Sequence, residues 1–142
     1  MTNILFICKH NRFRIRVASA YFNKINKNPA NHARGAESTS GILAFILRLI
    51  PLNRNEINLS REIGLDIKGK PHLLTSRLLK WADVYVIAAN NVSPSILRKS
   101  KKFWKKVIVW KIPDADWSNK KEIKHSINLI IKHVNKLVRE LK

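Results

Sequence analysis

The chain has 142 residues, of which 45% are hydrophobic, and its 28 basic and nine acidic side chains give a formal net charge of +19. This length and apolar content predict one core, and we expect a single domain spanning residues 1–142. No apolar run reaches the roughly 18 residues of a membrane-spanning helix. The single cysteine excludes an internal disulfide and a cysteine-rich zinc site.

The amino-terminal stretch "MTNILFIC" has no basic leader before its apolar run. This pattern favours a first strand over a signal peptide. Together with the single cysteine it predicts a cytoplasmic protein. The longest apolar stretch, residues 41–52, is interrupted by Arg48 and Pro51, which favours a core or partner-facing helix.

Predicted strands and helices alternate along the chain. Continuous apolarity predicts a buried strand at 3–8, and helical spacing of apolar residues predicts a helix at 15–27. The same patterns predict, in order, a strand at 33–37, helices at 42–50, 56–64 (with Gly64 as its stop) and 74–82, a strand at 83–89, a helix beginning at Ser93, a strand at 106–112 and a helix at 119–141. This alternation predicts an α/β fold: a doubly wound, four-stranded parallel sheet flanked by helices.

Three polar turns follow predicted strands. They read "CKHNRFR" after the first strand, "ANN" after the strand at 83–89, and "IPDAD" after the last strand. Ligands of such sheets bind beyond the carboxyl ends of the strands. We therefore expect these three turns to converge on one rim.

The first of these turns contains a Cys-x5-Arg pattern, formed by Cys8 and Arg14. A loop between a strand and a helix can direct its backbone N–H groups at an anion, and the positive end of the helix adds to that field. The same field favours a lowered pKa of the cysteine thiol. The planar fork of Arg14 suits two oxygens of a tetrahedral anion, which would face the sulfur nucleophile. The alternative is a buried, inert cysteine at the end of a strand.

With its flanking residues, "ILFICKHNRFR" resembles the phosphate-binding loop of low-molecular-weight protein tyrosine phosphatases and of the arsenate reductases that share their fold. That loop runs Cys-x-x-Asn-x-x-Arg-Ser, and Cys8, Asn11 and Arg14 match it. The resemblance continues through "GAESTSGI", "GLDIKGKPHLLTSRLLKWADVYVIAANN" and "WKIPDADW". It covers nearly the whole chain in order and spacing.

The resemblance implies a two-step hydrolysis of a phosphomonoester, with a protein phosphotyrosine as one such substrate. Cys8 would be the nucleophile, Arg14 would stabilise the phosphoryl oxygens, and Asp114 would be the general acid. Asp116 is an alternative candidate for this role. Asp114 is favoured because it occupies the family's Pro-Asp position. No metal or other cofactor is implied. The implied phosphate-binding residues form one run: Lys9, His10, Asn11, Arg12, Phe13 and Arg14.

Several positions depart from the family pattern. Ile15 replaces the serine that hydrogen-bonds the thiolate, and Arg16 follows it where proline is common. Ala115 replaces the proline after the catalytic aspartate. The disulfide relay of thioredoxin-linked arsenate reductases needs further cysteines, which this chain lacks.

Two alternatives to an active phosphatase remain open at this stage. One is a phosphate-binding sensor or adaptor with weak or no turnover. The other is a nucleic-acid-binding protein, because in residues 98–106, "RKSKKFWKK", basic side chains surround Phe103 and Trp104. The simpler interpretation of that segment is a solvent-exposed helix end whose aromatic rings lie in the core. The expected partners are thus a phosphorylated protein or small phosphomonoester, and a polyanion on the basic surface.

Overall fold

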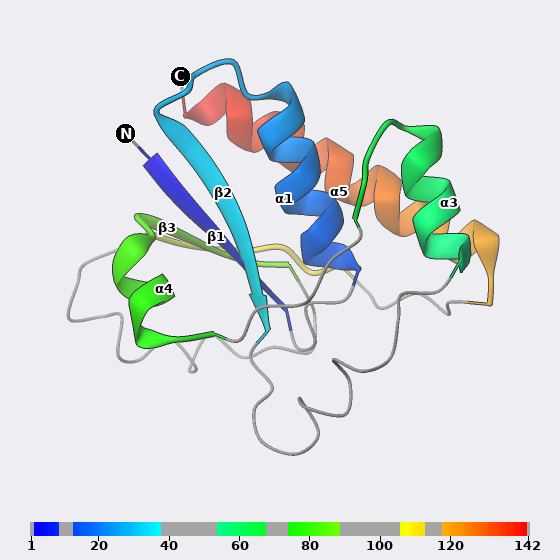
Figure 1. Ribbon diagram of the computed structural model, residues 1–142, viewed down its shortest axis with the longest axis horizontal. Coiled ribbons are helices and arrows are strands. Elements are labelled where there is room, and N and C mark those ends of the chain that lie inside the picture. The colour runs from blue at the N-terminus through cyan, green and yellow to red at the C-terminus, as the bar shows by residue number, and fades with distance from the viewer. Residues whose placement is uncertain are drawn as a thin grey trace.

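The computed structural model of the protein describes residues 2–8, 13–37, 54–67, 74–88, 106–112 and 118–141. Its sheet contains β1 (Thr2–Cys8), β2 (Asn31–Glu37), β3 (Val84–Ile87) and β4 (Lys106–Val109). The strands are parallel and lie in the order β2-β1-β3-β4 (Figure 1). The predicted fold class, a doubly wound four-stranded parallel sheet flanked by helices, is confirmed. The helices predicted at 42–50 and from Ser93 lie outside the described residues.

Helices cover both faces of the sheet. Helices α1 (Arg14–Ile25) and α5 (Lys120–Glu140) pack together on one face, and α3 (Arg54–Glu62) packs against α5 (Figure 1). The short helix α4 (Ser76–Trp81) lies on the other face and contacts β1 (Figure 1). This layering explains the apolar run of β1, since a strand covered on both faces exposes neither set of its side chains.

The core is centred on β1 and the inner face of α5. Residues 4–7 of β1 are fully buried, and the ring of Phe6 lies 6.4 Å from that of Phe22 and 5.5 Å from that of Trp110. On α5 the fully or nearly fully buried side chains recur every three or four positions, as predicted: Ile123, Ile127, Ile130, Val134 and Leu137.

Element ends differ from the predicted ones for identifiable reasons. Helix α1 ends at Ile25 instead of residue 27, and the N–H of Asn26 caps it by donating to the carbonyl of Phe22. Strand β2 begins at Asn31, two residues early, because an edge strand tolerates polar residues. Strand β4 ends at Val109, so the apolar, buried residues Trp110 and Ile112 lie beyond the strand. Gly64, with a φ of 76°, follows the end of α3 as expected.

Candidate functional site

Two predicted site residues flank the turn at the carboxyl end of β1. Cys8 is the last residue of β1 and is 2% exposed, while Arg14 is the first residue of α1 and is 4% exposed. Beside them, the N–H of Ala88 after β3 donates to the carbonyl of Ile7 at 2.9 Å. Cys8 and Arg14 therefore lie at the rim where ligands bind in sheets of this class.

The guanidinium of Arg14 is bonded to the segment that follows β4. Its Nη1 donates to the carbonyl oxygen of Ile112 at 3.0 Å, across 98 positions of sequence. A guanidinium has five N–H donors in a rigid fork, and this bond fixes the orientation of the fork. The contact also fixes the chain two residues before Asp114. Sequence reasoning did not identify Ile112, because a backbone carbonyl leaves no signature in a sequence.

An aromatic pair supports the same segment. The ring of Trp110 stacks on that of His133 of α5 with centroids 5.0 Å apart, and Trp110 is buried against Phe6. Burial and the nearby charges of Lys132 and Lys136 lower the pKa of His133 from its ordinary value. These effects favour the neutral form of the His133 imidazole. This pair was also missed, although it holds the chain leading to Ile112.

The residues on either side of Arg14 point into the core. Phe13 is 7% exposed and belongs to the core cluster. Its carbonyl accepts the N–H of Val17 at 3.0 Å, so it begins the hydrogen bonding of α1. Ile15 is fully buried. The position where the phosphatase loop that this sequence resembles has serine is therefore a packing position here.

Arg16 ties α1 to the chain after α3. Its side chain is half-buried, and its Nη1 donates to the carbonyl oxygen of Ile67 at 2.9 Å. The side chain is therefore engaged in a tertiary contact instead of pointing into solvent. This bond holds the first turn of α1, which carries Arg14, against residues 65–67.

The remaining predicted site residues lie outside the described residues. They are Lys9, His10, Asn11 and Arg12 of the loop, and Asp114 with its rival Asp116. Their roles stay predictions. In the parts of the chain that the structure describes, no three His, Cys, Asp or Glu side chains come together as metal ligands. No helix among the described residues is long and apolar enough to cross a membrane.

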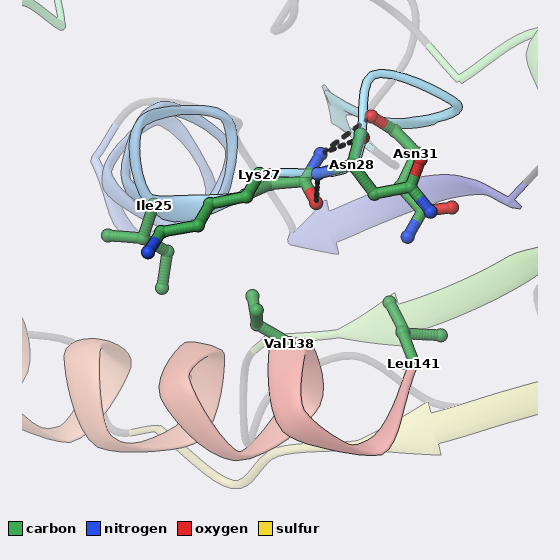
Figure 2. A pocket seen from close by; sticks show the side chains of 7 residues that line it. Ile25, Lys27, Asn28, Asn31, Val138 and Leu141 are labelled. Atoms are coloured by element: carbon green, nitrogen blue, oxygen red, sulfur yellow. Dashed lines mark hydrogen bonds between the residues drawn. The ribbon is translucent and has the colours of Figure 1, made fainter.

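A pocket of about 280 Å³ lies at the opposite end of the sheet. Ile25 and the turn after α1 form one wall, and Val138 of α5 and the C-cap residue Leu141 form the other (Figure 2). Amide groups order that turn, since Asn26 Nδ2 donates to the carbonyls of Asn28 and Asn31 at 2.7 and 2.9 Å (Figure 2). This pocket is at the amino ends of β1 and β2 and is separate from the Cys8 rim.

Comparison of the whole structure with solved structures finds close matches in fold. YwlE from Bacillus subtilis, solved as a mutant, superposes with a TM-score of 0.82 at 16% identity, covering 99% of each chain. Wzb from Vibrio vulnificus, bound to benzylphosphonate, gives 0.80 at 19% identity over 98% of each chain. An arsenate reductase from Archaeoglobus fulgidus gives 0.69 at 23% identity, over 95% of this chain and 98% of that one.

These matches define a class of fold. No protein-family model matches the sequence, and no curated relative is detected by sequence similarity. The structural neighbours include a low-molecular-weight protein tyrosine phosphatase from Streptococcus pyogenes, with a TM-score of 0.79 at 14% identity, in addition to arsenate reductases. The resemblance noted in the sequence is therefore confirmed in the structure: this chain has the low-molecular-weight phosphatase fold.

Proposed function

We propose that this protein is a cysteine-dependent phosphomonoester hydrolase that acts through a cysteinyl-phosphate intermediate. The observation that carries the proposal is the placement of Cys8 and Arg14, both buried, at the two ends of one strand-to-helix turn. The bond from Arg14 to Ile112 adds support, because it brings the chain that leads to Asp114 to the same rim. The shared fold with tyrosine phosphatases is consistent with this chemistry.

The proposed reaction has two displacement steps at phosphorus. The Cys8 thiolate attacks, the bond from phosphorus to the leaving oxygen breaks, and Asp114 donates its proton to that oxygen. Water then attacks the phosphocysteine, Asp114 accepts a proton, and the sulfur–phosphorus bond breaks to release inorganic phosphate. Arg14 and the backbone N–H groups of residues 9–14 stabilise the charge on the equatorial oxygens in both steps.

A protein phosphotyrosine is the substrate class that we propose to test first. The neighbours support phosphorylated substrates but differ in which one: Wzb from Escherichia coli K30 is described as a tyrosine phosphatase, and YwlE from Geobacillus stearothermophilus as an arginine phosphatase. The net charge of +19 favours acidic phosphoproteins over neutral ones. Arsenate reduction through an intramolecular disulfide relay is excluded by the single cysteine.

A second candidate is a phosphate-binding sensor without turnover, and the burial of Ile15 favours it. Its side chain is fully buried, and it has no hydroxyl that could donate to the Cys8 thiolate. Such a sensor would bind phosphate or vanadate with micromolar to millimolar affinity and release no product.

Hydrolysis of p-nitrophenyl phosphate between about pH 5 and pH 7.5 distinguishes the two candidates. Under the hydrolase proposal, Cys8→Ser abolishes turnover and Asp114→Asn lowers kcat by about 100-fold or more. Asp83→Asn is the matched control, because Asp83 is exposed at the amino end of β3. Phosphate or vanadate binding by a wild-type protein without turnover would favour the sensor, and turnover that survives Cys8→Ser would contradict the mechanism.

A further inference from the structure

Strand β2 is an edge of the sheet, and most of its outward backbone groups are covered by asparagines. The N–H and C=O groups of Asn31, Ala33 and Gly35 point away from β1. Asn31 donates to the carbonyl of Asn28 at 3.0 Å and accepts from Asn26 Nδ2 at 2.9 Å. The side-chain amide of Asn23 bonds both the N–H and the C=O of Ala33 at 3.1 Å. These caps prevent strand addition along the amino half of β2.

Gly35 is the next outward position and has no such cap. Among the described residues, no hydrogen bond is made by its outward N–H or C=O. An uncapped donor and acceptor on an edge strand are a template for the main chain of another polypeptide. Gly35 pairs with Phe6, two positions before Cys8, so this open part of the edge lies toward the proposed active-site rim.

A groove of about 790 Å³ runs along this open edge. Gly35 and its neighbours in β2 lie at its centre, Ser19 of α1 lies on one side, and Thr75, Arg77 and Leu78 lie on the other. The guanidinium of Arg34 stacks on the ring of Trp81, 4.8 Å from its centroid. Within the part of the chain that the structure describes, neither Arg34 nor Arg77 has an ion pair with a carboxylate. The groove therefore combines strand-pairing groups with two cations, one of which is oriented by stacking.

We propose that this groove binds an extended, acidic segment of a partner polypeptide as an added strand beside Gly35. The main chain of the segment would bond the N–H and C=O of Gly35. A Glu or Asp side chain of the segment would meet Arg34 and Arg77, because alternate side chains of a strand point to one face. The proposal rests on the edge and its charges and does not depend on phosphatase activity.

Fluorescence anisotropy with a labelled peptide of alternating Glu and Val tests the proposal in low-salt buffer. We expect binding to weaken by about five- to tenfold in Arg77→Gln and in Arg34→Gln. The matched control is Arg61→Gln, an exposed arginine of α3 whose loss changes the net charge equally. It should change the dissociation constant by less than about twofold. No binding by the wild-type protein, or equal losses in all three variants, would overturn the proposal.

Two further probes test strand addition itself. A peptide with Gln for Glu, and one with N-methyl groups on alternate amides, should each bind at least about tenfold more weakly. The Gly35 amide should exchange more slowly with solvent when the acidic peptide is bound. Full binding of the N-methylated peptide would overturn strand addition. The groove would instead be assigned to nucleic acid if single-stranded DNA bound the wild-type protein more tightly than the peptide does and if this DNA binding were lost in Arg77→Gln.

Discussion

Arg14 joins two parts of the candidate site that are far apart in the sequence. A guanidinium that is 4% exposed is costly to bury unless its donors are bonded, and its bond to the carbonyl of Ile112 meets part of that requirement. Under the proposed mechanism, this buried arginine would have a chemical role in addition to the structural one of fastening the strand-to-helix turn to the chain before Asp114. Its planar shape is important to both.

Replacing Arg14 with lysine separates charge from geometry. Lysine keeps the positive charge but loses the planar fork, so kcat/KM for p-nitrophenyl phosphate should fall by about 100-fold or more. Arg16→Lys is the control, since Arg16 is two positions away in the same helix and donates to the backbone carbonyl of Ile67. Its kcat/KM should fall by less than about tenfold. Similar losses in the two variants would indicate a general effect on α1.

Ile15 tests whether the absent hydroxyl limits turnover. Ile15→Ser would place a donor near the thiolate, and Ile15→Ala removes the same packing without adding the hydroxyl. Both should lower the free energy of unfolding by about 2–4 kcal/mol, because Ile15 is fully buried. We expect kcat/KM of the serine variant to exceed that of the alanine variant by about fivefold or more. Equal activities would show that this position does not reach the sulfur.

The sequence predicted that Cys8 and Arg14 lie at the two ends of one strand-to-helix turn, because their spacing and their place after an apolar strand are both local. It could not identify Ile112, whose contribution is a backbone oxygen brought in by tertiary packing. It also gave no partner for Arg16, whose side chain bonds the carbonyl of Ile67 in the structure.

Helix α5 and the segment after β4 are joined by the stacked rings of His133, which is titratable, and Trp110. The ring of His133 stacks on Trp110 with Lys132 and Lys136 nearby, and its pKa is lowered chiefly by burial. The unfolded chain therefore binds a proton at His133 at a higher pH than the folded chain does. The stabilising contribution is complete above the unfolded pKa of about 6.5 and is lost as the pH falls below it.

The free energy of unfolding should therefore decrease as the pH is lowered from about 7.5 to about 5, measured by urea denaturation at each pH. His133→Phe keeps an aromatic ring against Trp110 and should reduce the slope of this dependence. His125→Gln, an exposed histidine of the same helix, serves as the control and should keep the wild-type slope. An unchanged slope in His133→Phe would contradict the assignment.

Element types were predictable where one pattern dominated. Strand β1 has a continuous apolar run, and helix α5 has a helical repeat of apolar residues. Both elements are found as predicted, to within one residue at each end. The predicted strand at 106–112 was too long, because two of its last three residues, Trp110 and Ile112, are apolar for a different reason. Both side chains are buried by packing against the core after the chain has left β4 and not by lying in a strand, although the N–H of Trp110 still donates to the carbonyl of Ile87 at 2.8 Å. Hydropathy alone does not separate these two causes of burial.

The net charge of +19 should affect the rate and selectivity with which the whole protein binds charged partners. Long-range attraction should select acidic phosphopeptides and should weaken as salt screens it. We expect kcat/KM for an acidic phosphotyrosine peptide to fall by about tenfold or more between about 50 and 500 mM NaCl. The value for p-nitrophenyl phosphate should change by less than about threefold. A flat response of the peptide would show that the charge does not select substrates.

The covalent intermediate provides the most direct test of the proposed chemistry. The protein is mixed with p-nitrophenyl phosphate, and the reaction is quenched in acid within the first turnovers. The mass of the intact protein is then measured by mass spectrometry, and peptide mapping locates the modified residue. The account predicts a gain of one phosphoryl group at Cys8, absent in Cys8→Ser and strongly reduced in Arg14→Lys. Phosphate release by the wild-type protein that persists in Cys8→Ser, with no phosphoryl group on Cys8, would contradict it.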